Sequence, residues 1–185
     1  MKKRNVLIIG AGGIGSFLIP LLDKTGLYNM KVYDPDIVEE KNLTYQNFTT
    51  ADLEKKKVNA MAERYDIDAQ PYPVLTAGQL VGHDLVVCCA DNLDIRRTMY
   101  NCKGLKWLDL RAQARNAAMI SFLEDPKLYN VFTSGPDGSF SCQGEWDGKP
   151  EGINFMQVVI AGYGVQWMQR WFNGDYVEKH FKING

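Results

Sequence analysis

The chain has 185 residues, of which 45% are hydrophobic and 23% are charged, and its formal net charge at pH 7 is −1. These values predict one soluble globular domain over residues 1–185 and give no electrostatic reason to expect a nucleic-acid partner. The apolar runs are too short for a membrane span, and the first one ends in glycines rather than in a cleavage site, so we expect a cytoplasmic protein without a signal peptide.

The pattern at the start of the chain predicts a nucleotide-binding turn. Residues 6–9 are four apolar residues that run into glycines and then into apolar residues at helical spacing, which predicts a buried strand, a turn and a helix. Gly10, Gly12 and Gly15 have the Gly-x-Gly-x-x-Gly spacing. We expect Gly10 to allow the sharp turn, Gly12 to let the backbone approach a phosphate, and Gly15 to let the helix pack on the strand. The helix N-terminus would then face the anion.

A second strand is predicted over residues 30–33 and ends at Asp34, close to where a Rossmann acidic residue takes ribose hydroxyls. That placement fits ATP and NAD equally. Residues 34–48 form a polar segment longer than a crossover needs, which is typical of a functional loop. A helix is predicted to begin near Thr50, with one face formed by Val58, Met61, Ala62 and Tyr65.

The third predicted strand, residues 72–75, is weak because Pro71 and Pro73 flank and interrupt it. Residues 84–91 are a stronger buried strand that ends in Asp91 and Asn92. Because ligands of open α/β sheets bind beyond the carboxyl ends of strands, Asp91 is well placed for a magnesium ion.

The remaining pattern predicts a helix over residues 92–102, strands over 105–110 and 118–123, a mobile loop over 133–152, a helix over 156–172 and a short strand within 176–183. The whole chain therefore predicts the α/β class. We expect a Rossmann-like, open and mostly parallel sheet with helices on both faces and antiparallel strands toward the C-terminus.

The cysteines and histidines argue against a structural zinc site, because no Cys-x-x-Cys pair occurs and His83 and His180 are the only histidines. Cys88 and Cys89 lie in an apolar run and are predicted to be buried thiols. Cys142 is predicted to lie in a polar, exposed loop.

Several short motifs follow one another in a fixed order. They are Gly10-x-Gly12-Gly13-x-Gly15, Asp34-x-Asp36-x-Val38, Asn42-Leu43-x-x-Gln46, Lys57 with Ala60 three positions later, Asp91-Asn92-x-x-x-Arg96, and Ser141-Cys142. This ordered set, which spans nearly the whole chain, resembles the superfamily of ubiquitin-activating enzymes with its bacterial ThiF and MoeB relatives.

The resemblance implies adenylation of a C-terminal carboxylate with ATP and Mg²⁺. The substrate would be a ubiquitin-like or sulfur-carrier protein that ends in glycine. The site residues that the resemblance implies are Gly10, Gly12, Gly13, Gly15, Asp34, Asp36, Asn42, Gln46, Lys57, Asn92 and Arg96 for the nucleotide, Asp91 for the metal, and Lys57, Asp91 and Cys142 for catalysis.

Within that set, Lys57 would neutralise the phosphates and Asp34 would hold the ribose. Arg96 would either fix the Asp91 loop or, as we favour, join a structural ion pair. Cys142 matches a cysteine that joins covalently to the carrier in some relatives, although an incidental loop thiol also fits.

Two departures from the family pattern bear on activity. Tyr45 stands where the family has an arginine, which removes a fixed positive charge that Arg111 or Arg115 would have to replace. Only a few residues precede the predicted first strand, so the N-terminal helix that lends an arginine to a neighbouring subunit in many relatives is expected to be missing.

Two other functions remain open. One is a non-catalytic, nucleotide-binding partner of another activating enzyme, which Tyr45 favours. The other is an NAD-dependent oxidoreductase, which the glycine turn and Asp34 allow but Lys57 and Asp91 disfavour. We expect a homodimer, for which residues 162–164 and the aromatic residues Trp167, Trp171 and Phe172 offer a face unless they are core.

Overall fold

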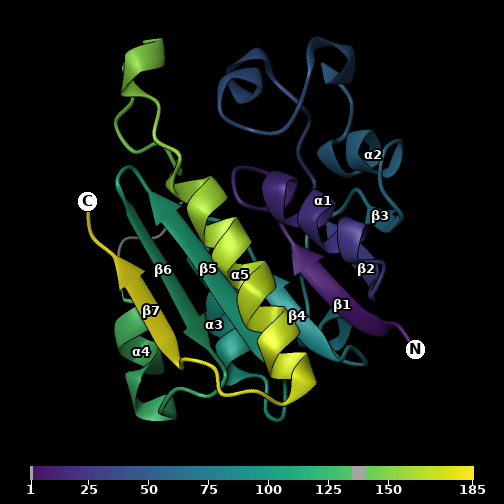
Figure 1. Ribbon diagram of the computed structural model, residues 1–185, viewed down its shortest axis with the longest axis vertical. Helices are drawn as coiled ribbons and strands as arrows, with labels where there is room; N and C mark the ends of the chain where they lie inside the picture. Colours follow the sequence, from purple (N-terminus) through teal and green to yellow (C-terminus); the bar gives the residue numbers. More distant parts are fainter. Residues whose placement is uncertain (1, 135–140) are drawn as a thin grey trace.

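The computed structural model describes residues 2–134 and 141–185, which form a seven-stranded sheet in the order β3-β2-β1-β4-β5-β6-β7 (Figure 1). The first five strands in this order run parallel, and β6 and β7 are antiparallel to their neighbours. The strands are β1 Arg4–Ile9, β2 Tyr28–Tyr33, β3 Ile67–Gln70, β4 Leu85–Cys88, β5 Trp107–Gln113, β6 Asn116–Ser121 and β7 His180–Ile183. This confirms the predicted fold class.

The α-helices are α1 Gly15–Thr25, α2 Lys57–Ala62, α3 Leu93–Asn101, α4 Tyr129–Phe132 and α5 Met156–Asn173. Short 3-10 helices occupy Glu40–Thr44, Thr50–Asp52, Ala77–Gln79, Pro126–Leu128 and Pro150–Gly152. The two long helices α1 and α5 end as their sequences indicate, because Gly26 and Gly174 adopt the left-handed conformation at the C-caps.

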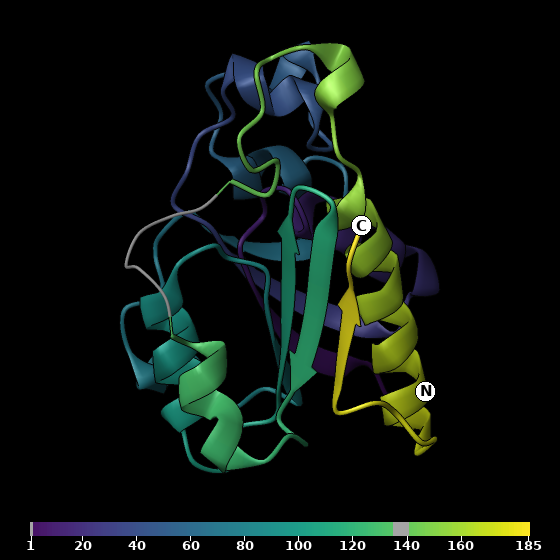
Figure 2. The same ribbon diagram turned by 90° about the vertical axis from the view of Figure 1, so that its left-hand side faces the viewer.

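Helices cover both faces of the sheet (Figure 2). Val6 and Ile8 of β1 face a core built with α1, α2 and α5, whereas Leu7 and Ile9 face a second core built with α3. Alternate residues of a strand point to opposite faces, so a strand buried on both sides must be apolar throughout. This explains the unbroken apolar run at residues 6–9.

The structure corrects two predicted elements. The helix expected near Thr50 begins only at Lys57, because Glu54 has a left-handed φ of +66° and residues 36–38 pair with the segment before Lys57. Ala62, expected on its buried face, is exposed. The strand expected over residues 72–75 is also wrong, since the third strand is Ile67–Gln70.

The aromatic residues of α5, which the sequence offers as a dimer face unless they are core, belong largely to the core. Trp167 is 2% exposed, and a Cβ built on Gly164 would lie 2.6 Å from Leu110 Cδ1, so the helix rests directly on β5. Trp171 and Phe172 are partly buried against the same core.

Among the described residues, no helix has the length and hydropathy that crossing a membrane requires. Part of the loop predicted over residues 133–152, namely 135–140, lies outside the described residues.

Candidate functional site

The glycine turn joins β1 to α1 at the carboxyl edge of the sheet. Gly10 has a φ of +97°, and a Cβ there would lie 3.0 Å from the backbone nitrogen of Ala90. A Cβ on Gly15 would overlap the carbonyl oxygen of Gly10. Both positions therefore require glycine for the turn itself. At Gly12 a Cβ would meet nothing closer than 3.8 Å, so the protein itself does not explain that glycine, whereas close approach of a ligand would.

Asp34 fastens the glycine turn to the end of β2. Its Oδ2 accepts a 2.7 Å hydrogen bond from the backbone N–H of Ala11, and its Oδ1 accepts a 2.8 Å hydrogen bond from that of Asp36. Burial raises the pKa of Asp34 above its usual value, while Lys57 and these backbone groups oppose the rise. Both oxygens are thus engaged in holding the turn, and the more exposed Asp36 presents the next carboxylate to the solvent side.

Lys57 is the buried member of the lysine triplet. Its backbone N–H donates to the carbonyl of Asp36 over 3.0 Å, and its Nζ lies 2.9 Å from Asp36 Oδ2. Lys55 pairs with Glu63, and Lys56 reaches the carbonyl of Pro35. Lys57 therefore differs from its neighbours in being 7% exposed and held at the first residue of α2.

The segment after Asp36 brings an amide to the glycine turn. Asn42 is buried, and its Oδ1 accepts from the backbone N–H of Glu39, so it shapes the 3-10 helix. Both amide atoms of the Gln46 side chain lie 3.8 Å from the position that a Cβ on Gly12 would occupy. Lys57 Nζ lies 3.9 Å from the same position. The Tyr45 ring packs edge-on against Trp146.

Asp91 and Asn92 lie just beyond β4. Asn92 Oδ1 accepts a 2.7 Å hydrogen bond from the backbone N–H of Asp94 and so caps α3. Asp91 is exposed on the wall of the cleft described below. In the part of the chain that the structure describes, no three His, Cys, Asp or Glu side chains form a metal cluster. A single carboxylate suits Mg²⁺ that is held mainly by nucleotide phosphates and water.

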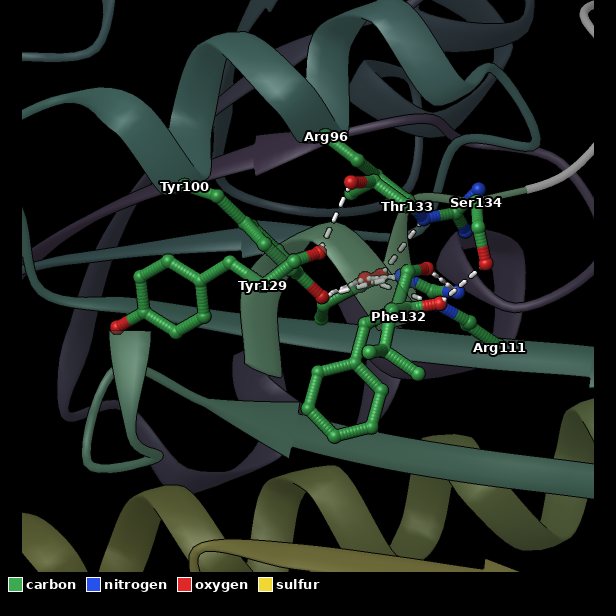
Figure 3. Close-up of polar contacts among 9 residues, drawn as sticks. Arg96, Tyr100, Arg111, Tyr129, Phe132, Thr133 and Ser134 are labelled. Carbon is green, nitrogen blue, oxygen red and sulfur yellow. Dashed lines mark hydrogen bonds and ion pairs between the residues drawn. The ribbon is translucent and has the colours of Figure 1, made fainter. Parts of the chain in front are cut away.

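Arg96 belongs to a buried ionic cluster centred on Asp109. Figure 3 shows Arg96, Tyr100 and Arg111 of this cluster. Arg96 Nε and Arg111 Nη2 lie 2.9 and 2.7 Å from the two carboxylate oxygens of Asp109, and Tyr100 donates its hydroxyl over 2.7 Å. Burial opposes the charged carboxylate, but the two arginines hold the pKa of Asp109 below its usual value. Arg111 also donates to the carbonyl of Phe132 over 2.6 Å. Of the two roles expected for Arg96, the geometry therefore supports the structural ion pair, with Asp109 as the partner.

Cys142 lies against the glycine turn rather than in an exposed loop, which corrects the sequence prediction. A Cβ on Gly13 would be 2.5 Å from its Sγ, and its carbonyl accepts from the backbone N–H of Ala114 over 2.9 Å. Burial raises the pKa of the Cys142 thiol, so the thiol is protonated at neutral pH. Any thiol chemistry here requires prior deprotonation.

These groups line one open cleft of about 1450 Å³ at the carboxyl ends of β1, β2, β4 and β5. Its lining includes Gly10, Gly12, Gly13, Asp34, Asp36, Asn42, Gln46, Lys57, Asp91, Asn92, Arg96, Arg111 and Cys142. The structure thus brings together nearly all the predicted site residues, but Gly15 and Arg115 are not among the lining residues.

Two residues that shape the site escaped the sequence analysis. Asp109 interrupts the apolar run of β5 just before Arg111, and this carboxylate among apolar residues was a usable signal. Gln157 is wholly buried at the start of α5, and a glutamine within an apolar helix gives no signal until its neighbours are known.

The chain is similar to known proteins over the residues that build this cleft. The model of the ThiF family matches residues 1–108, more than half of the chain. The chain belongs to the ThiF family. The matched residues contain the glycine turn, Lys57 and Asp91.

Among curated ThiF-family relatives, the adenylyltransferase and sulfurtransferase UBA4 of Yarrowia lipolytica is 30% identical over 106 residues, covering 52% of this chain and 27% of that protein. The ubiquitin-like modifier-activating enzyme 5 of Bombyx mori is 28% identical over 133 residues, covering 59% of this chain and 34% of that protein. The chain therefore spans about a quarter and about a third of the length of these two relatives, respectively.

Solved structures share the fold. MccB of E. coli, solved with ATP, aligns with a TM-score of 0.74 at 16% identity over all of this chain and 61% of its own. PaaA aligns with a TM-score of 0.69 at 15% identity over 98% of this chain and 60% of its own.

Proposed function

We propose that this ThiF-family chain uses ATP to adenylate the C-terminal carboxylate of a ubiquitin-like or sulfur-carrier protein that ends in glycine. The observation that carries the proposal is the convergence at Gly12, where the buried Lys57 amine and the Gln46 amide arrive within 4 Å of the same point. A cation and an amide beside a glycine backbone and a helix N-terminus suit a polyphosphate. A hydride-transfer enzyme has no need of this set, which favours ATP over NAD.

The reaction places its main demands on charge and alignment. The substrate carboxylate is already ionised at pH 7, so it attacks the α-phosphorus without losing a proton. A carboxylate oxygen–phosphorus bond forms as the bond from the α-phosphorus to the bridging oxygen breaks, and pyrophosphate leaves with that electron pair. The site must therefore align the reactants and neutralise negative charge rather than supply a base.

The residues of the cleft divide these tasks. The turn at Gly10–Gly15 and the N-terminus of α1 receive phosphate oxygens, and Lys57 exchanges its bond to Asp36 for the phosphates. Asp34 holds the turn, and the more exposed Asp36 beside it would take ribose hydroxyls, the role that the resemblance assigns to Asp34. Asp91 would hold Mg²⁺, which when bound screens the charge of the phosphates.

Three apolar residues on the wall of the cleft, which we call the apolar lip, offer a place for the purine base. Val74, Leu75 and Ile95 line the cleft, and Leu75 is 78% exposed. Apolar side chains beside a few polar groups are typical of nucleotide sites, and covering this lip with a base would remove its exposed apolar surface from water.

The Asp109 cluster compensates in part for the arginine that Tyr45 replaces. With two arginines around one carboxylate, the cluster carries a net formal charge of +1, and both Arg96 and Arg111 line the cleft. Its guanidinium groups are bonded to Asp109, Tyr100 and Phe132. The cluster would therefore stabilise the negative charge of the phosphates through its electrostatic potential rather than through direct hydrogen bonds.

If the acyl group passes on to a thiol of this chain, Cys142 is the acceptor beside Gly13. The thiolate would attack the acyl carbon, form a thioester and release AMP. Cys142→Ser would then abolish a thioester that an added thiol cleaves by exchange, and adenylate formation would persist. A thioester that forms in the variant would exclude this residue.

The expected homodimer also remains a proposal. Light scattering of the purified chain tests it directly, and a mass of about 21 kDa rather than about twice that value would contradict it.

A non-catalytic nucleotide-binding partner is the second candidate, favoured by Tyr45 at the family's arginine position. Both candidates require ATP binding, so the first test is calorimetric titration of the chain with ATP and with NADH, each with and without Mg²⁺. The adenylation proposal expects magnesium-dependent ATP binding that Lys57→Ala weakens at least tenfold. Lys55→Ala, a neighbour outside the cleft, serves as the matched control. Binding of NADH alone would overturn both candidates.

A further inference from the structure

Two buried side-chain atoms within residues 2–134 and 141–185 have no hydrogen-bond partner, Gln46 Oε1 and Gln157 Oε1. They come from distant parts of the chain, yet both side chains flank the glycine turn, Gln46 beside Gly12 and Gln157 beside Gly13. An unsatisfied buried polar atom destabilises the folded chain, and such atoms are few in native proteins. Their occurrence together at the phosphate side of the cleft requires an explanation.

Gln157 connects three parts of the site. It lies in the first turn of α5 and is wholly buried. Its Cβ is 3.9 Å from the position of a Cβ on Gly13, and its Nε2 donates to the carbonyl of Tyr45 over 3.2 Å. Because Tyr45 directly precedes Gln46, this one amide fixes the backbone from which the Gln46 side chain extends toward Gly12.

The amide is not explained by packing. A methionine has a similar shape, leaves no buried oxygen unsatisfied and suits the apolar surroundings of α5. What methionine lacks is the N–H donor that holds the Tyr45 carbonyl. The donor is therefore the property of Gln157 that the site uses.

We propose that Gln157 is a positioning residue of the nucleotide site, which acts through the Tyr45 carbonyl to keep the Gln46 amide beside Gly12 and Lys57. The inference rests on the proposed function, since it assigns Gln157 to the phosphate end of the ATP site. It predicts that loss of the donor weakens binding of the phosphates and leaves binding of the nucleoside unchanged.

The test compares ATP and adenosine binding, both with Mg²⁺, in the wild type, Gln157→Met, Gln46→Ala and the double variant. Gln166→Met is the matched control, because Gln166 is exposed on the same helix. Gln157→Met should lower ATP affinity about tenfold, leave adenosine affinity unchanged, and have no further effect when Gln46 is already alanine. Thermal unfolding of each variant shows whether the variant is folded.

Three results would overturn the inference: wild-type ATP affinity in Gln157→Met, an equal loss for ATP and adenosine, or full additivity with Gln46→Ala. Should Gln157→Met not fold, Gln157→Leu, which is apolar and also lacks the donor, is measured in the same way with the same expectations. Failure of the proposed function is distinguishable, because the wild type itself then fails to bind ATP.

Discussion

The contact between Gly13 and Cys142 gives the sharpest prediction about the architecture of the site. A methyl group at residue 13 would lie 2.5 Å from Cys142 Sγ and 3.3 Å from its Cβ. Cysteine is a short side chain on a segment that is also bonded to Ala114, so it has little room to move away. We expect Gly13→Ala to lower the free energy of unfolding by about 1–3 kcal/mol, the usual cost of overpacking.

The assay is urea denaturation of four proteins: the wild type, Gly13→Ala, Cys142→Ala and the double variant. Removing Sγ should relieve most of the clash, so the double variant should be more stable than the sum of the two single changes predicts. Gly162→Ala is the control, because nothing lies within 4 Å of a Cβ there and alanine favours a helix interior. Wild-type stability in Gly13→Ala, or strict additivity, would refute the placement of Cys142 on the turn.

Two further predictions concern the elements that carry Lys57 and the ionic cluster. Glu54→Gly should raise the free energy of unfolding by about 0.5–1 kcal/mol, because Glu54 has a φ of +66° that glycine adopts without strain; a destabilised variant in urea denaturation would contradict this. Because the pKa of Asp109 is lowered on folding, its stabilisation is present above its unfolded pKa and is lost as the pH falls through its folded pKa. Asp109→Asn should therefore cost about 3 kcal/mol at pH 7 and lose less stability than the wild type between pH 5 and pH 2, and parallel pH profiles would contradict the assignment.

The sequence predicted the centre of the sheet because local and tertiary preferences agree there. Residues 6–9 and 85–88 are apolar without interruption, which only a strand buried on both faces requires. At the edge the signal fails. The strand β3 has three half-buried residues and the exposed Asp68, and the apolar residues that suggested a strand, Tyr72, Val74 and Leu75, lie just beyond it on either side of Pro73.

The helix predicted from Thr50 failed for a different reason. The residues before Lys57 have acceptable helical patterning, but the backbone groups of Glu54 and Lys55 bond to Val38 instead, and the N–H of Lys57 bonds to the carbonyl of Asp36. Pairing of Val38 with Glu54 and Lys55 is a contact across the chain that periodicity cannot reveal. It also has a functional consequence, since it delays the helix until Lys57 and places this lysine next to Asp36.

The candidate site was predictable where a motif carries it. Lys57, Asp91 and the glycines stand at motif positions, and the cleft brings them together. Gln157 and Asp109 could not be assigned in this way, because each acts through partners that only the folded chain supplies. The burial of Cys142 against Gly13 is likewise a tertiary contact, and it changes the expected state of the thiol.

The most direct test of the central claim is exchange of labelled pyrophosphate into ATP, measured with a panel of ubiquitin-like and sulfur-carrier proteins that end in glycine. The account predicts magnesium-dependent exchange with at least one carrier, and its loss in Asp91→Ala and in a carrier without its terminal glycine. ATP binding without exchange for any carrier, or undiminished exchange in Asp91→Ala, would contradict the adenylation mechanism proposed for this cleft.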